Sequence, residues 1–121
     1  MGGFNTVMIG GNLVHDPNVQ IVGQRGEERM RASFRMAVEP DEDGQDPAFV
    51  DVLLSGRQAE IIGQYIMKGS AVIVEGRLKE SVWEWESGRE HRRVVIIAKR
   101  VEFIGEKRTN TPPGKASKIT P

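Results

Sequence analysis

Residues 29–39, RMRASFRMAVE, alternate strictly between apolar side chains and polar or charged ones. A period of two is typical of a β-strand with one buried and one exposed face, because successive side chains point to opposite sides of a strand. The buried side would carry alternate residues from Met30 to Val38, and the exposed side a row of cations that includes Arg31 and Arg35. The chain therefore needs a β-sheet that is covered on one side.

The rest of the chain is mostly strand-like. β-branched and apolar stretches bounded by turn residues predict strands within residues 4–13, 19–28, 48–56, 70–85 and 91–105. The stretch 57–70 differs, because its apolar residues recur at a helical spacing and Gly69 is placed as a stop signal. One short helix between the third and fourth strands is the order expected of an all-β, five-stranded Greek-key barrel, the OB-fold.

The C-terminal segment differs in composition from the rest of the chain. Residues 106–121 contain three prolines and show no apolar periodicity, so they cannot bury enough apolar surface to offset the entropy of ordering. We expect an OB-fold domain over residues 1–105, followed by a flexible basic tail over residues 106–121.

Composition narrows the compartment and the partners. The 121 residues contain no cysteine, which removes disulfides and thiolate metal sites. No apolar run approaches the roughly 18 residues of a membrane span, and no signal-peptide pattern is present, so we expect a cytoplasmic protein without a membrane partner. The net charge of +0 is an average of unlike segments, because residues 39–46 are acidic and residues 105–121 are basic. The sum therefore does not exclude a nucleic-acid partner.

Both tryptophans lie in a charged stretch, residues 76–88, GRLKESVWEWESG. In a strand, Trp83 and Trp85 share one side with Arg77 and Lys79. The side that we expect to face the core carries Val72, Val74, Leu78 and Val82. Aromatic rings beside cations suit an unpaired nucleic-acid strand, because any base can stack on a ring and every phosphate attracts a positive group.

Three stretches resemble the bacterial single-stranded DNA-binding protein family and occur in the family's order: VMIGGNLVHDP, RASFRMAV and KGSAVIVEGRLKESVW. The resemblance covers roughly residues 4 to 104. It implies an OB-fold, a homo-oligomer that is usually a tetramer, and sequence-nonspecific binding of single-stranded DNA during replication, repair or recombination, at the nucleoid. It also implies that Phe49 and Trp83 stack on bases, and that Lys79 and Arg57 lie at commonly basic positions.

The predicted nucleic-acid-binding residues combine these arguments. Phe49 points outward in the stretch 48–56, whereas the cations of residues 29–39 could equally form a solvated strand face. Trp85 could equally pack against a hairpin or another subunit, and Arg92 belongs to a basic cluster that could line a phosphate path. The predicted set is Phe49, Trp83, Trp85, Arg77, Lys79, Arg57, Arg31, Arg35 and Arg92.

No motif predicts catalysis, a metal site or a cofactor. His15 and His91 lie far apart in sequence and have no cysteine beside them, and Ser55 has no activating partner nearby. The acidic stretch DEDGQD lacks the glycine at the sixth position of a calcium loop. We expect a binding protein rather than an enzyme.

The chain departs from the family pattern at its end. The family typically ends in an acidic tail with a hydrophobic tip that recruits replication and repair proteins, whereas this chain ends in Lys115, Lys118 and Pro121. Partner recruitment by that route is therefore in doubt. The alternative function is that of an OB-fold replication protein of the primosome type, which would use the same surface mainly to dock other proteins.

Overall fold

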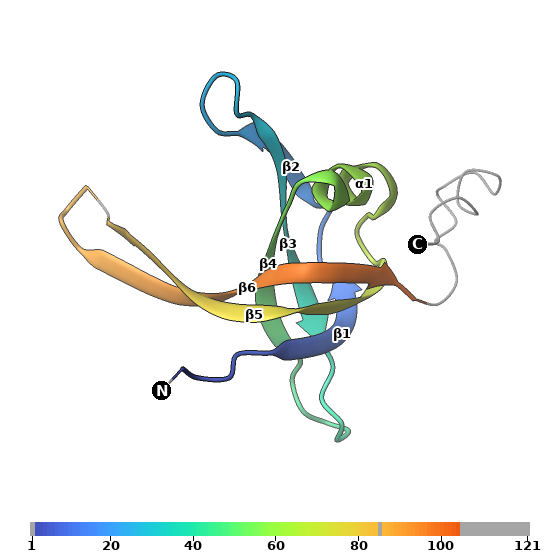
Figure 1. The fold of residues 1–121 in the computed structure, drawn as a ribbon. Coiled ribbons are helices and arrows are strands. Elements are labelled where there is room, and N and C mark those ends of the chain that lie inside the picture. Colours follow the sequence, from blue (N-terminus) through green and yellow to red (C-terminus); the bar gives the residue numbers. More distant parts are fainter. Residues whose placement is uncertain (1, 85, 105–121) are drawn as a thin grey trace.

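The structure is a computed structural model that describes residues 2–84 and 86–104, with only the backbone of Trp83 and Glu84. Its elements are β1 (Val7–Leu13), β2 (Asn18–Val22), β3 (Arg29–Val38), β4 (Ala48–Ser55), α1 (Arg57–Tyr65), β5 (Ala71–Glu84) and β6 (Glu90–Phe103) (Figure 1). The predicted tail over residues 106–121 lies outside the described residues, so the division of the chain near residue 105 stays a prediction.

Five strands close into a ring. The sheet order is β1-β5-β6-β4-β3-β2, and β1 also pairs with β3 through Asn12↔Ala37 and Leu13↔Met36. Within the described residues, β2 pairs with β3 alone and lies outside the ring. In chain order, α1 therefore falls between the third and fourth ring strands. This arrangement confirms the predicted OB-fold, with β2 as an additional short strand.

The ring closes where β1 crosses from β5 to β3. Gly11 pairs with Val72 of β5, and a Cβ atom on Gly11 would overlap the carbonyl oxygen of Ala37 in β3. The adjacent Gly10 has ordinary space, since its nearest neighbour would be Ile73 Cγ1 at 3.6 Å. The close approach of β1 to β3 therefore requires a glycine at position 11 and not at position 10.

The core lies inside the ring and follows the predicted alternation. The buried apolar side chains of β3, β4, β5 and β6 include Ala32, Phe34, Met36, Val52, Leu54, Val72, Val74 and Ile96. α1 covers one end of the ring (Figure 1) and contributes Ala59 and Ile62 to the same core. The apolar face of one short helix thus completes the barrel.

α1 is shorter than the sequence pattern indicates. It ends at Tyr65 because Ile66 adopts an extended backbone and buries its side chain in the core. Gly69 then lies in the turn before β5, where the backbone N–H of Met67 donates to Ser70 Oγ. No helix among residues 2–84 and 86–104 is long and apolar enough to cross a membrane.

β5 and β6 extend beyond the ring as a two-stranded arm, formed by residues 79–84 and 90–95, with the pair Leu78↔Ile96 at its base (Figure 1). β1 and β4 pair with these strands only closer to the ring. The expectation that Leu78 and Val82 face the core is wrong, because their exposed fractions are 46% and 47%. Strand alternation was read correctly, but no described element covers that side of the arm.

Candidate nucleic-acid interface

Strand register brings most of the predicted binding residues to one surface. The outer side of β5, β6, β4 and β3 forms continuous rows across four strands, and we name it the four-strand face. One row consists of Arg77, Ile97, Leu53 and Ser33. Two residues further along each strand, Lys79 pairs with Val95 and Asp51 pairs with Arg35, on the same side of the sheet.

Cations line both sides of the four-strand face. Arg31 and Arg35 form the β3 row, and Arg77 and Lys79 form the β5 row. All four are exposed, and none takes part in an ion pair within the described part of the chain. Because neighbouring strands lie about 4.8 Å apart, the two rows are roughly 14 Å apart along the sheet. Positive charge therefore flanks the two central strands.

The central strands, β4 and β6, present an aromatic and aliphatic surface between these rows. The exposed fraction of Phe49 is 51%, and the guanidinium carbon of Arg35 lies 5.4 Å from its ring centroid, within cation–π range. Leu53 and Ile97 are half-buried, and Val95 is buried. The ring of Phe49 is thus available for stacking beside a cation that is free of carboxylates in the described residues.

One carboxylate lies within this surface. Asp51 is opposite Arg35 in the register, and its Oδ2 lies 3.1 Å from Nη1 of Arg93 on β6. This ion pair compensates a negative charge that would otherwise repel phosphate groups on the face. Arg93 therefore belongs to the four-strand face, with its charge shared with Asp51.

Arg92 lies on the opposite side of the arm. It pairs with Val82, and its guanidinium donates hydrogen bonds to carboxylates of Glu80 and Glu90, the latter at 2.7 and 3.1 Å. The hydrogen bond to Glu80, followed by the one to Glu90, raises the pKa of Arg92 above its ordinary value. The register thus separates Arg92 from the other predicted cations.

The Arg92→Ala variant should leave the salt dependence of oligo-dT binding unchanged. The reason is that the guanidinium faces away from the four-strand face and is engaged by two carboxylates. A residue that contacts a phosphate would instead lower the slope of log Kobs against log salt concentration by about 0.7 for a single strand. Titrations at several salt concentrations measure this slope, and a decrease of that size would place Arg92 in contact with DNA.

Two further predicted residues, Arg57 and Trp83, lie at the margins of the face. Arg57 is the exposed first residue of α1, two positions after Ser55, which pairs with Arg31. Trp83 is a residue of β5 near the end of the arm, at an odd-numbered position like Arg77 and Lys79 of the β5 row. Its side chain, and all of Trp85, fall outside what the structure describes.

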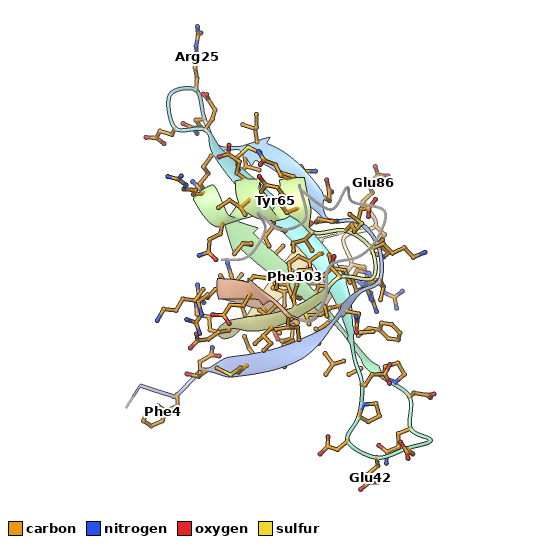
Figure 2. The ribbon with its side chains drawn as sticks, turned by 90° about the vertical axis from the view of Figure 1, so that its right-hand side faces the viewer. Phe4, Arg25, Glu42, Tyr65, Glu86 and Phe103 are labelled. Carbon is orange, nitrogen blue, oxygen red and sulfur yellow. The ribbon has the colours of Figure 1, made fainter. Side chains whose placement is uncertain are left out.

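The acidic connection between β3 and β4 extends away from the ring at the end opposite α1 (Figure 1). Figure 2 shows Glu42 near the far end of this connection. Its carboxylates therefore lie beyond the ends of the two strands rather than across the four-strand face.

Sequence reasoning did not select the aliphatic part of the face. The alternation of residues 48–56 does place Leu53 outward, so that signal was available. The run VVII over residues 94–97 gives no such signal, because it is apolar on both sides. Only the register with β4 shows that Val95 and Ile97 lie between the cation rows.

A separate cleft lies between α1 and β6. Its volume is 510 Å³, and its apolar wall includes Ile61, Tyr65 and Phe103. The described residues that line it include none of the predicted nucleic-acid-binding set. Lys99 and Arg100 line the cleft beside this apolar wall, together with Glu75 and Glu102.

Comparison with known proteins identifies the family. Residues 4–104 match the model of the Single-strand binding protein family. The chain belongs to this family. The resemblance noted in the sequence is thereby confirmed, and the four-strand face is a surface of a family member.

Several single-stranded DNA-binding proteins are similar to this family member. The protein of that name from Helicobacter hepaticus is 32% identical over 110 residues, which are 86% of this chain and 63% of the relative. The one from Fusobacterium nucleatum is 35% identical over 114 residues, 89% of this chain and 71% of the relative. Single-stranded DNA-binding protein 1 of Xylella fastidiosa is 29% identical over 121 residues, 96% and 88% of the two chains. The chain thus spans less than two thirds of some relatives.

Proposed function

We propose that this chain binds single-stranded DNA without sequence preference. The observation that carries the proposal is the four-strand face, where two rows of exposed cations flank an exposed aromatic ring and an aliphatic surface. The names of the similar proteins support the same ligand. They favour DNA binding over the alternative of a primosome-type docking module.

The residues of the four-strand face suit single-stranded DNA that is bound regardless of its sequence. Stacking on Phe49 works for any base, because every base has a π-face. The arginines and lysine bind phosphates, which are identical along the strand and carry no sequence information. The face therefore favours affinity over discrimination, as protection of a transient single strand requires.

The wider role follows from this ligand. We propose that the protein covers single-stranded DNA in replication, repair or recombination, at the nucleoid in the cytoplasm, and that it binds rather than catalyses. We propose a homo-oligomer, with a tetramer as the expected state. The outward, half-buried side chain of Ile73 supports contact with another subunit, because apolar groups on an outer strand face gain from being covered.

Titration of the full chain with oligo-dT at two salt concentrations tests the proposal, with intrinsic tryptophan fluorescence as the readout. Strong quenching and a steep loss of affinity at the higher salt concentration are expected, because phosphate contacts release counterions. Absence of binding at the lower salt concentration would reject DNA binding and leave the docking function as the better account of the face.

The Lys79→Ala variant should bind oligo-dT with a reduced salt slope. Lys79 is exposed in the β5 row and has no ion-pair partner within the described residues, so its ammonium group is available to one phosphate. Loss of one contact lowers the slope by about 0.7 for a single strand. Lys68→Ala is the matched control, since Lys68 is exposed in the connection between α1 and β5. Equal slopes for the two variants would remove Lys79 from the interface.

A further inference from the structure

We propose that the four-strand face continues past β5 onto the N-terminal segment, where a cleft holds one further phosphate of the bound strand and Phe4 stacks on the adjoining base. This inference rests on the proposed function. The cleft has a volume of 410 Å³ and is lined by Asn5, Thr6, Glu75, Gly76, Arg77, Ile97, Ala98 and Lys99. Arg77 and Ile97 also belong to the four-strand face, so the two surfaces are continuous.

The side chain of Asn5 fixes the segment that precedes β1. Its Nδ2 donates to the carbonyl oxygen of Leu78 at 2.8 Å, and the N–H of Leu78 donates to its Oδ1 at 2.7 Å. Extending the pair Val7↔Gly76 by two residues also places Asn5 opposite Leu78. The amide side chain therefore replaces the backbone contacts of a strand residue and fixes to β5 the residue that follows Phe4.

A β-bulge gives the cleft its shape. The register between β5 and β6 skips Lys99, which is the extra residue on β6. Bulges redirect side chains and often border binding sites. A Cβ atom on Gly76 would overlap the carbonyl oxygen of Ile97, so bare backbone forms this part of the wall. Glycine at position 76 thus lets β5 approach the backbone of β6 closely beside the bulge.

The charges in the cleft favour an anion. Arg77 and Lys99 are both exposed, and neither takes part in an ion pair among residues 2–84 and 86–104. The only acidic residue among the described lining is Glu75, whose Oε1 lies 3.4 Å from Nη2 of Arg100. Arg100 also pairs with Glu102, whose Oε1 lies 3.4 Å from its Nε. The cleft and its border therefore carry three cations, Arg77, Lys99 and Arg100, against two carboxylates, and this excess of positive charge favours a phosphate group.

Phe4 supplies the aromatic partner. Its side chain is fully exposed, and Figure 2 shows it clear of the barrel at the start of the chain. Its Cα lies within about 7 Å of that of Thr6, because a chain advances at most about 3.6 Å per residue. A nucleotide with its phosphate beside Arg77 and Lys99 can therefore place its base on this ring.

The test compares wild-type protein, Phe4→Ala and Lys99→Ala in oligo-dT titrations over lengths of about 4 to 16 nucleotides, the range occupied by single OB-folds. The variants should bind the shortest oligonucleotides as the wild type does, because these occupy the four-strand face alone. For the longest, Phe4→Ala should weaken binding roughly tenfold, and Lys99→Ala should lower the salt slope by about 0.7. The oligomer mass, measured by light scattering, should not change.

Two variants control for loss of an exposed side chain. Met8→Ala removes an apolar group that is exposed on β1 without lining the cleft, and Lys68→Ala removes an exposed lysine that does not line the cleft. Wild-type-like binding at all lengths by Phe4→Ala and Lys99→Ala would overturn the inference while leaving the proposed function intact. So would dissociation of the oligomer in Phe4→Ala, or equal weakening at every length. Absence of wild-type binding at every length would reject the proposed function and this inference with it.

Discussion

Alanine in place of Phe49 weakens oligo-dT binding by about 1–3 kcal/mol, and the Trp83→Ala exchange does so by a similar amount, because each removes a stacking surface for one base. Phe49 is half-exposed between the cation rows, and Trp83 belongs to β5 with the parity of Lys79. The measurement is fluorescence anisotropy of a labelled oligonucleotide, since Trp83→Ala removes part of the intrinsic signal.

Two comparisons separate stacking from general loss of apolar surface. Ile21→Ala is the matched control, because Ile21 is 70% exposed on β2, outside the four-strand face. Phe49→Trp and Trp83→Phe keep an aromatic ring and should keep most of the affinity. If Phe49→Ala binds no more weakly than Ile21→Ala, Phe49 is not a base platform.

Gly11→Ala lowers the free energy of unfolding by about 1–3 kcal/mol, the usual cost of forcing an extra carbon into a packed site. The added Cβ would overlap the Ala37 carbonyl oxygen, so β1 and β3 must separate where they close the ring. Urea denaturation followed by circular dichroism measures the effect. All variants need the same protein concentration, because the proposed assembly would contribute to apparent stability.

Gly10→Ala provides a neighbouring control. Its Cβ would meet Ile73 Cγ1 at 3.6 Å and the Val72 carbonyl oxygen at 3.7 Å, which are ordinary contacts. A much smaller loss of stability is therefore expected for this variant. Equal losses at both positions would show that glycine matters here through backbone freedom in general and not through the contact with Ala37.

Local pattern was sufficient for the strands and the helix, but not for the closure of the ring. Strict alternation in residues 29–39 predicted which β3 side chains are buried, and the change of period after Ser55 predicted α1. The closure of β1 on β3 is a contact between residues far apart in sequence, and no local pattern encodes it. The same limit explains the error at Leu78 and Val82, because alternation indicates a face but not whether another element covers it.

The site was predictable by residue type and less so by arrangement. Arg31, Arg35, Arg77 and Lys79 were selected as cations on strand faces, and register was needed to place them on two sides of one surface. The pairing of Asp51 with Arg93 and the position of Arg92 between two glutamates depend on cross-strand neighbours. The hydrogen bonds between Asn5 and Leu78 join residues 73 positions apart in the sequence, so no local pattern predicts them.

The arm gives the two cation rows unequal mechanical support. Arg31 is anchored by pairing with Gln20 on one side and Ser55 on the other, whereas Lys79 stands on a ribbon of only two strands. Isolated two-stranded ribbons are marginally stable in water. A ligand that spans both rows therefore stabilises the ordered form of the ribbon, because it binds that form. Any change that loosens the ribbon lowers the affinity for the ligand in turn.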